Sequence, residues 1–195
     1  MKRIGLFGGT FDPVHIGHLV AAAEARYQLR LDRVLMVVAN EPWQKVGERV
    51  VTPADDRFVV VDAAVEGLAG LEASRLEIDR GGPSYTADTV AELRATYPGA
   101  ELFLVVGADV AASMGSWRRV ESMIDDVVLA VVDRGGVAPR VDLPRWRVEH
   151  VPIPSLEVSS SDLRRRLAEG RPVDLLVPAA ALRRMERLGL YAGGR

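Results

Sequence analysis

The chain has 195 residues, and its 25 basic and 27 acidic side chains leave a formal net charge of −2. This balance argues against a general nucleic-acid binder or a membrane-surface binder. The sequence contains no cysteine, which excludes disulfides, thiolate metal sites and cysteine nucleophiles. Because 48% of the residues are hydrophobic and no segment reads as a signal peptide or a membrane span, we expect one cytoplasmic globular domain over residues 1–195.

Short apolar runs alternate with segments of helical period along the chain, which is typical of βαβ units around a parallel sheet. Buried strands are predicted at residues 3–7, 34–39, 102–106 and 127–132, and weaker strands at 71–78 and 147–151. Helices are predicted at residues 18–30, 52–68, 84–97, from 159 onward and at 178–188, with N-caps at Thr52, Ser84 and Ser159. These elements predict an open, doubly wound α/β fold with a mainly parallel sheet, which binds ligands beyond the carboxyl ends of its strands.

Two further features leave alternatives open. The predicted loops at residues 40–51 and 135–146 are long enough to be functional lids or simply mobile segments. Residues 134–195 carry 12 basic and 7 acidic side chains, whereas residues 1–133 carry 13 basic and 20 acidic ones. The C-terminal third therefore either presents ordinary solvated helix faces or helps to hold an anionic ligand.

The most informative segment follows the first strand and reads Gly8-Gly9-Thr10-Phe11-Asp12-Pro13-Val14-His15-Ile16-Gly17-His18. Its two leading glycines allow a tight turn, and the helix that follows offers free backbone amides to a phosphate. His15 and His18 share a helix face and can stabilise negative charge on a phosphate in a transition state, and Gly17 leaves room for a large group. A metal site, which would need a third ligand, and a plain loop with incidental histidines are the alternatives. The segment has neither a Walker A lysine nor a G-x-G-x-x-G pattern.

A second candidate site for an anion opens the helix predicted from residue 159. Ser159, Ser160 and Ser161 bring hydroxyls and free amides to the helix start, and Arg164 lies about one turn further on. Together they can form a cradle for an oxyanion. The alternative is a serine-capped surface helix with a solvated, arginine-rich face.

Two single residues are candidates for contacts with the rest of a nucleotide. Trp117 follows Met114-Gly115-Ser116 and can stack on a pyridine ring, or it can be an ordinary core tryptophan. Asp109 comes directly after a buried strand, where it can accept hydrogen bonds from ribose hydroxyls, cap the following helix, or do both.

These segments resemble a known family. Residues 10–18, with their His-x-Gly-His, resemble the signature of the nucleotidyltransferase α/β phosphodiesterase superfamily, and residues 158–164 resemble its second signature, Ile-Ser-Ser-Thr-x-Ile-Arg, with three conservative changes. Residues 81–89, and Gly107-Ala108-Asp109 followed by Trp117, resemble bacterial nicotinate-nucleotide adenylyltransferases. The resemblance extends over residues 4–191 and implies a Rossmann-like nucleotidyltransferase fold with a C-terminal helical segment.

The resemblance also implies a reaction and its site. It implies transfer of AMP from ATP to nicotinate mononucleotide in NAD biosynthesis, with pyrophosphate released, Mg²⁺ carried by ATP and no metal site on the protein. The implied catalytic residues are His15 and His18. The implied ATP-binding residues are Gly8, Gly9, Thr10, Phe11, His15, His18, Lys45, Asp109, Ser160, Ser161 and Arg164, and the implied residues for the nicotinate nucleotide are Ser84, Tyr85, Thr86 and Trp117.

Alternatives to this reaction remain at the level of the sequence. The acceptor could be nicotinamide mononucleotide or phosphopantetheine, or the chain could be a non-catalytic nucleotide-binding regulator. We expect no nucleic-acid or membrane partner, and a homo-oligomer is compatible with the family. Preference for the acid over the amide is expected because backbone amides near Thr86, at the start of a helix capped by Ser84, favour a carboxylate.

Overall fold

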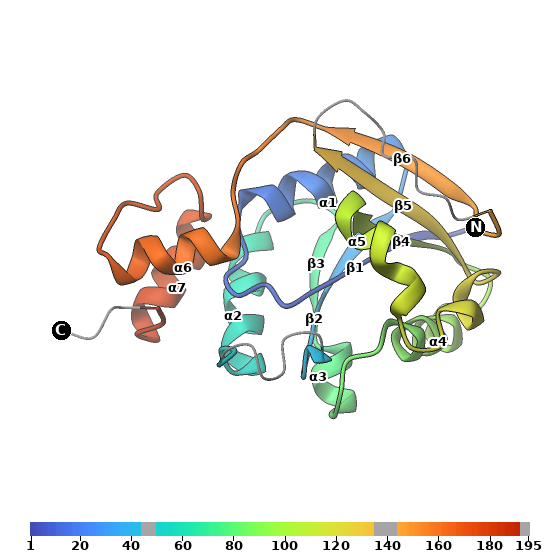
Figure 1. The fold of residues 1–195 in the computed structure, drawn as a ribbon, viewed down its shortest axis with the longest axis horizontal. Helices are drawn as coiled ribbons and strands as arrows, with labels where there is room; N and C mark the ends of the chain where they lie inside the picture. The colour runs from blue at the N-terminus through green and yellow to red at the C-terminus, as the bar shows by residue number, and fades with distance from the viewer. Residues whose placement is uncertain (44–49, 135–143, 192–195) are drawn as a thin grey trace.

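The computed structural model describes residues 1–43, 50–134 and 144–191. Its centre is a six-stranded sheet of parallel strands in the order β3-β2-β1-β4-β5-β6. The strands are β1 (Arg3–Gly9), β2 (Arg33–Val38), β3 (Leu71–Ser74), β4 (Glu101–Gly107), β5 (Val127–Arg134) and β6 (Val148–Ile153). Helices flank the sheet (Figure 1), which confirms the predicted doubly wound α/β fold.

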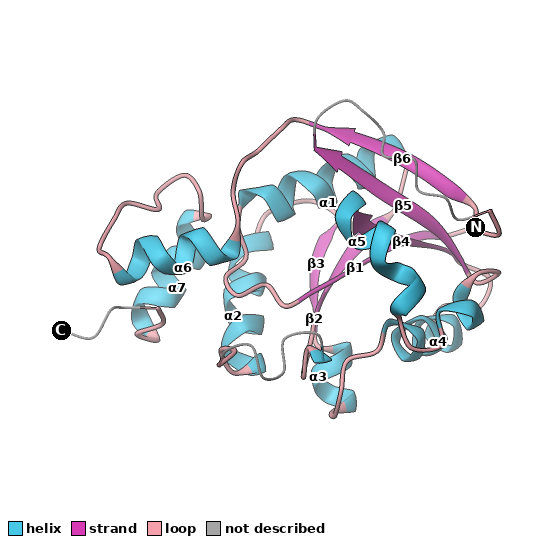
Figure 2. Cartoon of the chain, in the orientation of Figure 1, coloured by secondary structure: helices cyan, strands magenta, loops and turns pink. Residues whose placement is uncertain are grey.

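The helices divide between the sheet and a C-terminal segment. In chain order they are α1 (Ile16–Gln28), α2 (Ala54–Val65), α3 (Leu76–Arg80), α4 (Thr86–Thr96), α5 (Ala108–Ser113), α6 (Ser160–Ala168) and α7 (Ala179–Arg187). Figure 2 shows α6 and α7 together at one end of the molecule, and α7 packs against α2. This pair is the predicted C-terminal helical segment.

The sheet is buried on both faces, as its continuous apolar runs predict. Along β4, Leu102, Leu104 and Val106 join the core cluster that contains α4 and α5, whereas Phe103 and Val105 join the cluster that contains α1, α2 and the C-terminal helices. Successive side chains of a strand point to opposite faces, so the central strands contribute to both cores, whereas Leu71 and Ala73 of the edge strand β3 pack only against the cluster that contains α1 and α2.

The strand predicted at residues 71–78 is correct only in its first half. β3 ends at Ser74, and the helix α3 begins at Leu76. The apolar residues Leu71 and Ala73, and again Leu76 and Ile78, are two positions apart, as in a strand, but Leu76 and Ile78 pack toward different core clusters, as residues of a helix can. The hydroxyl of Ser74 accepts a hydrogen bond from the Leu76 backbone, which helps to start the helix instead.

The helix predicted at residues 52–68 is shorter than expected at both ends. Pro53, not Thr52, is the N-cap of α2, because the carbonyl of Thr52 is taken by the side chain of the buried Arg57 at 2.7 Å. The helix ends at Val65, and Gly67 has a φ of +77°, which turns the chain out of the helix.

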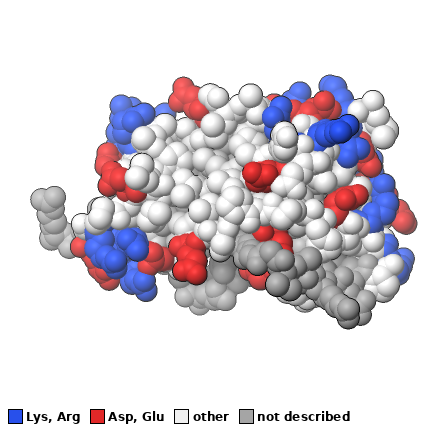
Figure 3. All heavy atoms as spheres, turned by 90° about the horizontal axis from the view of Figure 1, so that it is seen from above, with Lys and Arg blue, Asp and Glu red and all other residues white. Residues whose placement is uncertain are grey.

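The surface carries mixed charge. Figure 3 shows basic and acidic side chains interspersed toward both ends of one face, with a broad region of other residues between them. On α6, Arg165 and Arg166 both pair with Asp162, so these two arginines form local ion pairs rather than a free basic patch. Over the described ranges, no helix has the length and apolar character needed to cross a membrane.

Candidate functional site

The site lies where the strand order of the sheet reverses. The chain runs outward from β1 through β2 to β3 and then returns to β4 on the other side of β1. Open α/β sheets bind ligands at the carboxyl ends of the strands beside such a reversal. Here that position is occupied by residues 8–15, which we call the phosphate loop, and by the end of β4 at Gly107.

The two segments predicted to bind phosphate meet at this point. The hydroxyl of Ser160 donates to the carbonyl oxygen of Pro13 at 2.9 Å, and Nη1 of Arg164 donates to the carbonyl oxygen of Asp12 at 2.5 Å. Ser159 caps α6 by accepting from the backbone of Asp162 at 3.2 Å, as predicted. The N-termini of α1 and α6, which both favour anions, therefore lie next to one phosphate loop.

The two histidines form a stacked pair at the start of α1. Their ring centroids are 3.7 Å apart, and the ring of Phe11 meets His18 edge-on at 5.0 Å. The backbone N–H of His15 donates to Nδ1 of His18 at 3.2 Å. A neutral imidazole that accepts at Nδ1 carries its proton on Nε2, so His18 presents an N–H donor on the opposite side of its ring. His15 is only 2% exposed and stacks on the ring of His18.

Protein atoms, not an open space, explain why Gly9 of the phosphate loop and Gly17 of α1 are glycines. A β-carbon on Gly17 would lie 3.0 Å from Val158 and 3.1 Å from the ring of His15, so the space that this glycine leaves is taken by the segment before α6. A β-carbon on Gly9 would lie 2.7 Å from the ring of Phe11, which is 2% exposed. Gly8 is the open position of the loop, because nothing lies within 4 Å of its added β-carbon.

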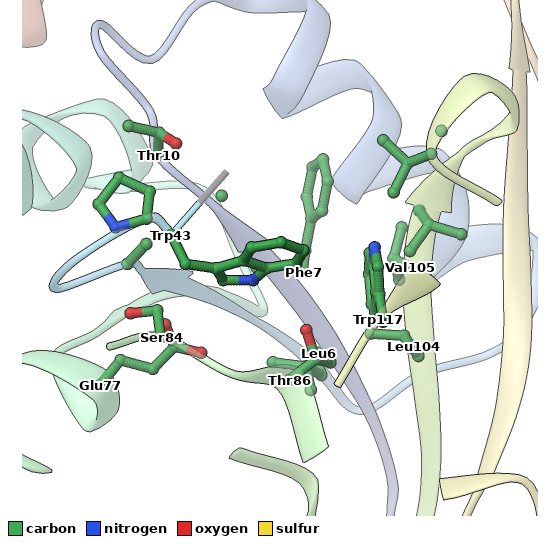
Figure 4. A pocket seen from close by; sticks show the side chains of 17 residues that line it. Leu6, Phe7, Thr10, Trp43, Glu77, Ser84, Thr86, Leu104, Val105 and Trp117 are labelled. Carbon is green, nitrogen blue, oxygen red and sulfur yellow. The ribbon is translucent and has the colours of Figure 1, made fainter. Parts of the chain in front are cut away.

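A pocket of about 230 Å³ adjoins the phosphate loop. Figure 4 shows the indole rings of Trp43 and Trp117 extending into it, with Thr10 on one side and Thr86 and Ser84 on the other. The pocket is lined mainly by apolar side chains and by backbone: Leu6, Phe7, Gly8, Gly9, Thr10, Ala39, Pro42, Trp43, Glu77, Ser84, Thr86, Leu104, Val105, Val106, Gly107, Val110 and Trp117. This mainly apolar lining suits an aromatic ring.

Trp117 contributes its side chain both to the pocket and to the edge of the core. It follows a short 3₁₀ turn at Met114–Ser116. Its Nε1 is buried and makes no hydrogen bond within the described residues. Asp109 lies in the first turn of α5 with its carboxylate beside Gly107, a residue that lines the pocket, and it is exposed.

Ser84 does not cap the helix that begins beside the pocket, contrary to expectation. The N-cap of α4 is Tyr85, and the hydroxyl of Ser84 instead accepts from the backbone N–H of Asn40 at 2.8 Å. The reason is a tertiary pairing, because the backbone N–H of Ser84 also donates to the carbonyl of Glu41 at 3.0 Å. The chain after β2 thus fixes the approach to α4, and Thr86 remains the first residue of this helix.

Sequence reasoning missed two residues of this region, Arg57 and Glu77. Arg57 is 1% exposed and donates to the carbonyls of Thr10, Asn40 and Thr52, so it ties the phosphate loop to the loop after β2. Glu77 lines the pocket, where it accepts from Thr89 at 2.5 Å. Neither belongs to a sequence motif, and a lone arginine on a helix predicts only a solvated face.

Tyr85, which the resemblance implies for the nicotinate nucleotide, lies beside Trp43 of the pocket. The ring centroids of Tyr85 and Trp43 are 6.3 Å apart, and the guanidinium of Arg118 lies over the ring of Tyr85, 4.8 Å from its centroid. Lys45 falls outside the described residues. Within residues 1–43, 50–134 and 144–191, no three His, Cys, Asp or Glu side chains lie close enough together to hold a metal ion.

Comparisons with known proteins show which family the chain belongs to. The cytidylyltransferase-like family model matches residues 6–166. The chain is 44% identical over 193 residues to a Saccharopolyspora erythraea protein named "Probable nicotinate-nucleotide adenylyltransferase", a match that covers 98% of this chain and 91% of the relative. A protein of the same name from Streptomyces coelicolor is 43% identical, with coverage of 95% and 99%.

Among solved structures, a nicotinic acid mononucleotide adenylyltransferase of Plasmodium falciparum complexed with NaAD has a similar fold. The TM-score is 0.81, with 98% of both chains covered, and the sequence identity is 17%. At that identity the likeness supports the fold and not the individual contacts.

Proposed function

Because this chain belongs to the nicotinate-nucleotide adenylyltransferase family, we propose how its site carries out the reaction. The enzyme transfers the adenylyl group of ATP to nicotinate mononucleotide, which yields nicotinate adenine dinucleotide and pyrophosphate. In our proposal the triphosphate of ATP lies over the phosphate loop and the start of α6, and the pyridine ring of the acceptor enters the pocket beside Trp117.

The observation that carries this proposal is the contact between α6 and the phosphate loop. The hydrogen bonds from Ser160 to Pro13 and from Arg164 to Asp12 bring two helix N-termini, a guanidinium and the His18 donor to one place. A triphosphate needs such a concentration of donors, because its charge grows on the leaving pyrophosphate during the reaction. We assign Gly8, Gly9, Thr10, Ser161 and, outside the described residues, Lys45 to the same triphosphate.

The chemistry requires orientation and charge neutralisation rather than a general base. A phosphate oxygen of the mononucleotide is already ionised, and it forms a bond to the α-phosphorus of ATP while the bond from that phosphorus to the bridging oxygen breaks. The electron pair of the broken bond leaves on pyrophosphate. We assign the Nε2–H of His18 to the oxygens of the α-phosphate, where it stabilises the transition state, and His15 to the support of that ring.

The acceptor half of the site is the pocket between the two tryptophans. The indole of Trp117 would stack on the pyridine, and the free backbone amides at the start of α4, near Thr86, would receive the carboxylate. Ser84 lines this end of the pocket and Tyr85 is the N-cap of α4. On the ATP side, Asp109 would accept hydrogen bonds from ribose hydroxyls. Since the amides belong to the backbone, they select a carboxylate without any basic side chain.

A divalent metal fits this site as a companion of ATP. The described residues offer no cluster of three metal-ligating side chains, and Mg²⁺ usually keeps several waters and binds substrate phosphates. We propose that Mg²⁺ is held by the triphosphate. When bound, it supplies neutralisation of charge on the phosphates, while Arg164 and the backbone amides supply their orientation.

The direct test is pyrophosphate release by the purified protein with ATP, Mg²⁺ and one acceptor at a time. We expect nicotinate mononucleotide to be the best acceptor of a panel that also contains nicotinamide mononucleotide and phosphopantetheine. Binding of ATP without pyrophosphate release for every acceptor would indicate a regulator instead. Release with phosphopantetheine alone would assign the pocket to a different substrate.

A further inference from the structure

A tyrosine near the C-terminus holds a buried carboxylate beneath the phosphate loop. The hydroxyl of Tyr191 donates to Oδ1 of Asp12 at 2.5 Å, although the two residues are 179 positions apart. Asp12 is 1% exposed, so its carboxylate faces protein and not the open site. A buried carboxylate needs a donor of this kind, since an unsatisfied one would be costly.

An uncommon backbone conformation at Tyr191 accompanies the hydrogen bond from its hydroxyl to Asp12. Tyr191 follows α7 and has a φ of +61°, in the left-handed region that residues with a β-carbon rarely adopt. Leu190 and Tyr191 both pack against the core cluster that contains α1 and α2. Such a conformation persists only where the surroundings determine it, and it often marks a functional region.

Arg57 completes a buried polar group below the loop. Its guanidinium binds the carbonyls of Thr10, Asn40 and Thr52 at 2.7 to 3.1 Å, and its positive charge also acts on the Tyr191 hydroxyl. The loop is therefore held from below at two of its residues, through the carbonyl of Thr10 and the side chain of Asp12.

The same loop is held from the other side by the residues assigned to ATP. The carbonyl of Asp12 accepts from Arg164, while the carboxylate of Asp12 accepts from Tyr191. Asp12 lies two residues after Thr10 and three residues before His15. A displacement of Asp12 would therefore move both the phosphate-binding amides and the histidine pair.

Tyr191 also has a stable protonation state for this role. Burial, and secondly the hydrogen bond to Asp12, raise the pKa of its hydroxyl above the ordinary value. The hydroxyl thus stays protonated at physiological pH and remains a donor.

We propose that Tyr191 and Asp12 are positioning residues of the adenylyl transfer reaction. The Tyr191 hydroxyl holds the Asp12 carboxylate, and through it the phosphate loop, in the geometry that His18 needs at the α-phosphate. The inference rests on the proposed function for its kinetic consequence, while its structural part is independent of the substrate. It gives the last residues of the described chain a role in catalysis, although they do not line the pocket.

The first test replaces Tyr191 by phenylalanine, which removes only the hydroxyl. Small displacements of reacting groups can cost about 100-fold in rate, so we expect kcat to fall by about tenfold or more. The KM for nicotinate mononucleotide should change little, because the pocket does not include Tyr191. Tyr97→Phe is the matched control, because Tyr97 is half-buried against the opposite core cluster and should keep the wild-type kcat. Wild-type kcat in Tyr191→Phe would overturn the proposal.

The second test asks whether Tyr191 acts through Asp12. Asp12→Asn keeps an acceptor oxygen for the tyrosine, so we expect it to retain more activity than Asp12→Ala. Combining Tyr191→Phe with Asp12→Ala should lower kcat no further than Asp12→Ala alone, because the shared interaction is already lost. If the two losses multiply, Tyr191 does not act through Asp12 and the proposal is wrong.

A third measurement does not depend on turnover. The chain has three histidines, so the ¹⁵N-detected ring signals of His18 can be assigned by comparison with His18→Ala. In folded Tyr191→Phe these signals should shift, and in Tyr97→Phe they should not. Unchanged His18 signals would overturn the positioning role. Absence of pyrophosphate release from the wild type with every acceptor would contradict only the proposed function, since the ring signals still report the geometry.

Discussion

The guanidinium of Arg164 donates a 2.5 Å hydrogen bond to the carbonyl oxygen of Asp12, which lies 152 residues earlier in the chain. The bond joins the two segments that resemble the family signatures, and it makes the position of the phosphate loop depend on α6. Arg164 also donates to the hydroxyl of Ser161 at 3.1 Å, so the orientation of its side chain is defined from both segments. A charged donor held in this way is ready for an anion before the anion arrives.

Arg164→Ala should therefore raise the KM for ATP clearly, by about tenfold or more, since a hydrogen bond to a charged group contributes about 1.5 to 3 kcal/mol. Initial rates at several ATP concentrations measure the change. Arg165→Ala is the control, because Arg165 is exposed and pairs with Asp162 on the same helix. Equal KM values for the two variants would remove Arg164 from the ATP site.

His18→Ala should lower kcat far more than it weakens ATP binding. A donor that acts on charge developing in the transition state is typically worth about 10² to 10³ in rate. Steady-state kcat and the Kd for a non-hydrolysable ATP analogue separate the two effects. A variant with wild-type turnover would show that the Nε2–H of His18 does not act on the reacting phosphate.

The enzyme should prefer nicotinate mononucleotide over nicotinamide mononucleotide. A carboxylate at the N-terminus of α4 would gain about 1.5 to 3 kcal/mol, or about tenfold to somewhat above a hundredfold in kcat/KM. Trp117→Ala should weaken both acceptors and leave their ratio nearly unchanged, because an indole stacks on either ring. A ratio near one in the wild type would contradict the explanation based on the helix terminus.

Activity should depend on added Mg²⁺ while the isolated protein retains little metal. Ions held mainly by substrate phosphates leave with the nucleotide on dialysis. Elemental analysis of dialysed protein and an EDTA titration of the rate check this. Zinc retained in a one-to-one ratio would instead support a metal site that includes His15 and His18.

Tyr191 should make the stability of the fold sensitive to alkaline pH. Since the pKa of its hydroxyl is raised in the folded state, the folded protein keeps this proton to higher pH than the unfolded chain does. The contribution is fully present below about pH 10, the ordinary tyrosine value, and is lost as the pH rises further. The urea midpoint of the wild type should thus fall more steeply above about pH 10 than that of Tyr191→Phe.

Tyr27→Phe provides the control for this measurement, because Tyr27 is 82% exposed. Its urea midpoint should follow the wild type across the same pH range. Parallel curves for the wild type and Tyr191→Phe would show that the buried hydroxyl does not couple its protonation to folding.

Local chemistry made much of this protein predictable from its sequence. The apolar runs of β1, β2, β4 and β5 predict buried parallel strands, because side chains on both faces must be apolar when helices cover both faces. Ser159 caps α6 as predicted, since a capping hydroxyl reaches a backbone N–H only three residues away. The histidine pair and the serine-arginine segment are likewise short motifs whose residue types already indicate phosphate chemistry.

Tertiary structure decided the features that depend on partners far apart in the chain. The hydroxyl of Ser84 binds Asn40 instead of capping α4, because the chain after β2 passes within hydrogen-bond distance. Arg57 looks like a solvated helix residue in the sequence, yet it is buried because three carbonyls of separate loops converge on it. The bond between Tyr191 and Asp12 has no sequence signal at all, since a buried polar group takes whichever partner the packing of distant elements brings within reach.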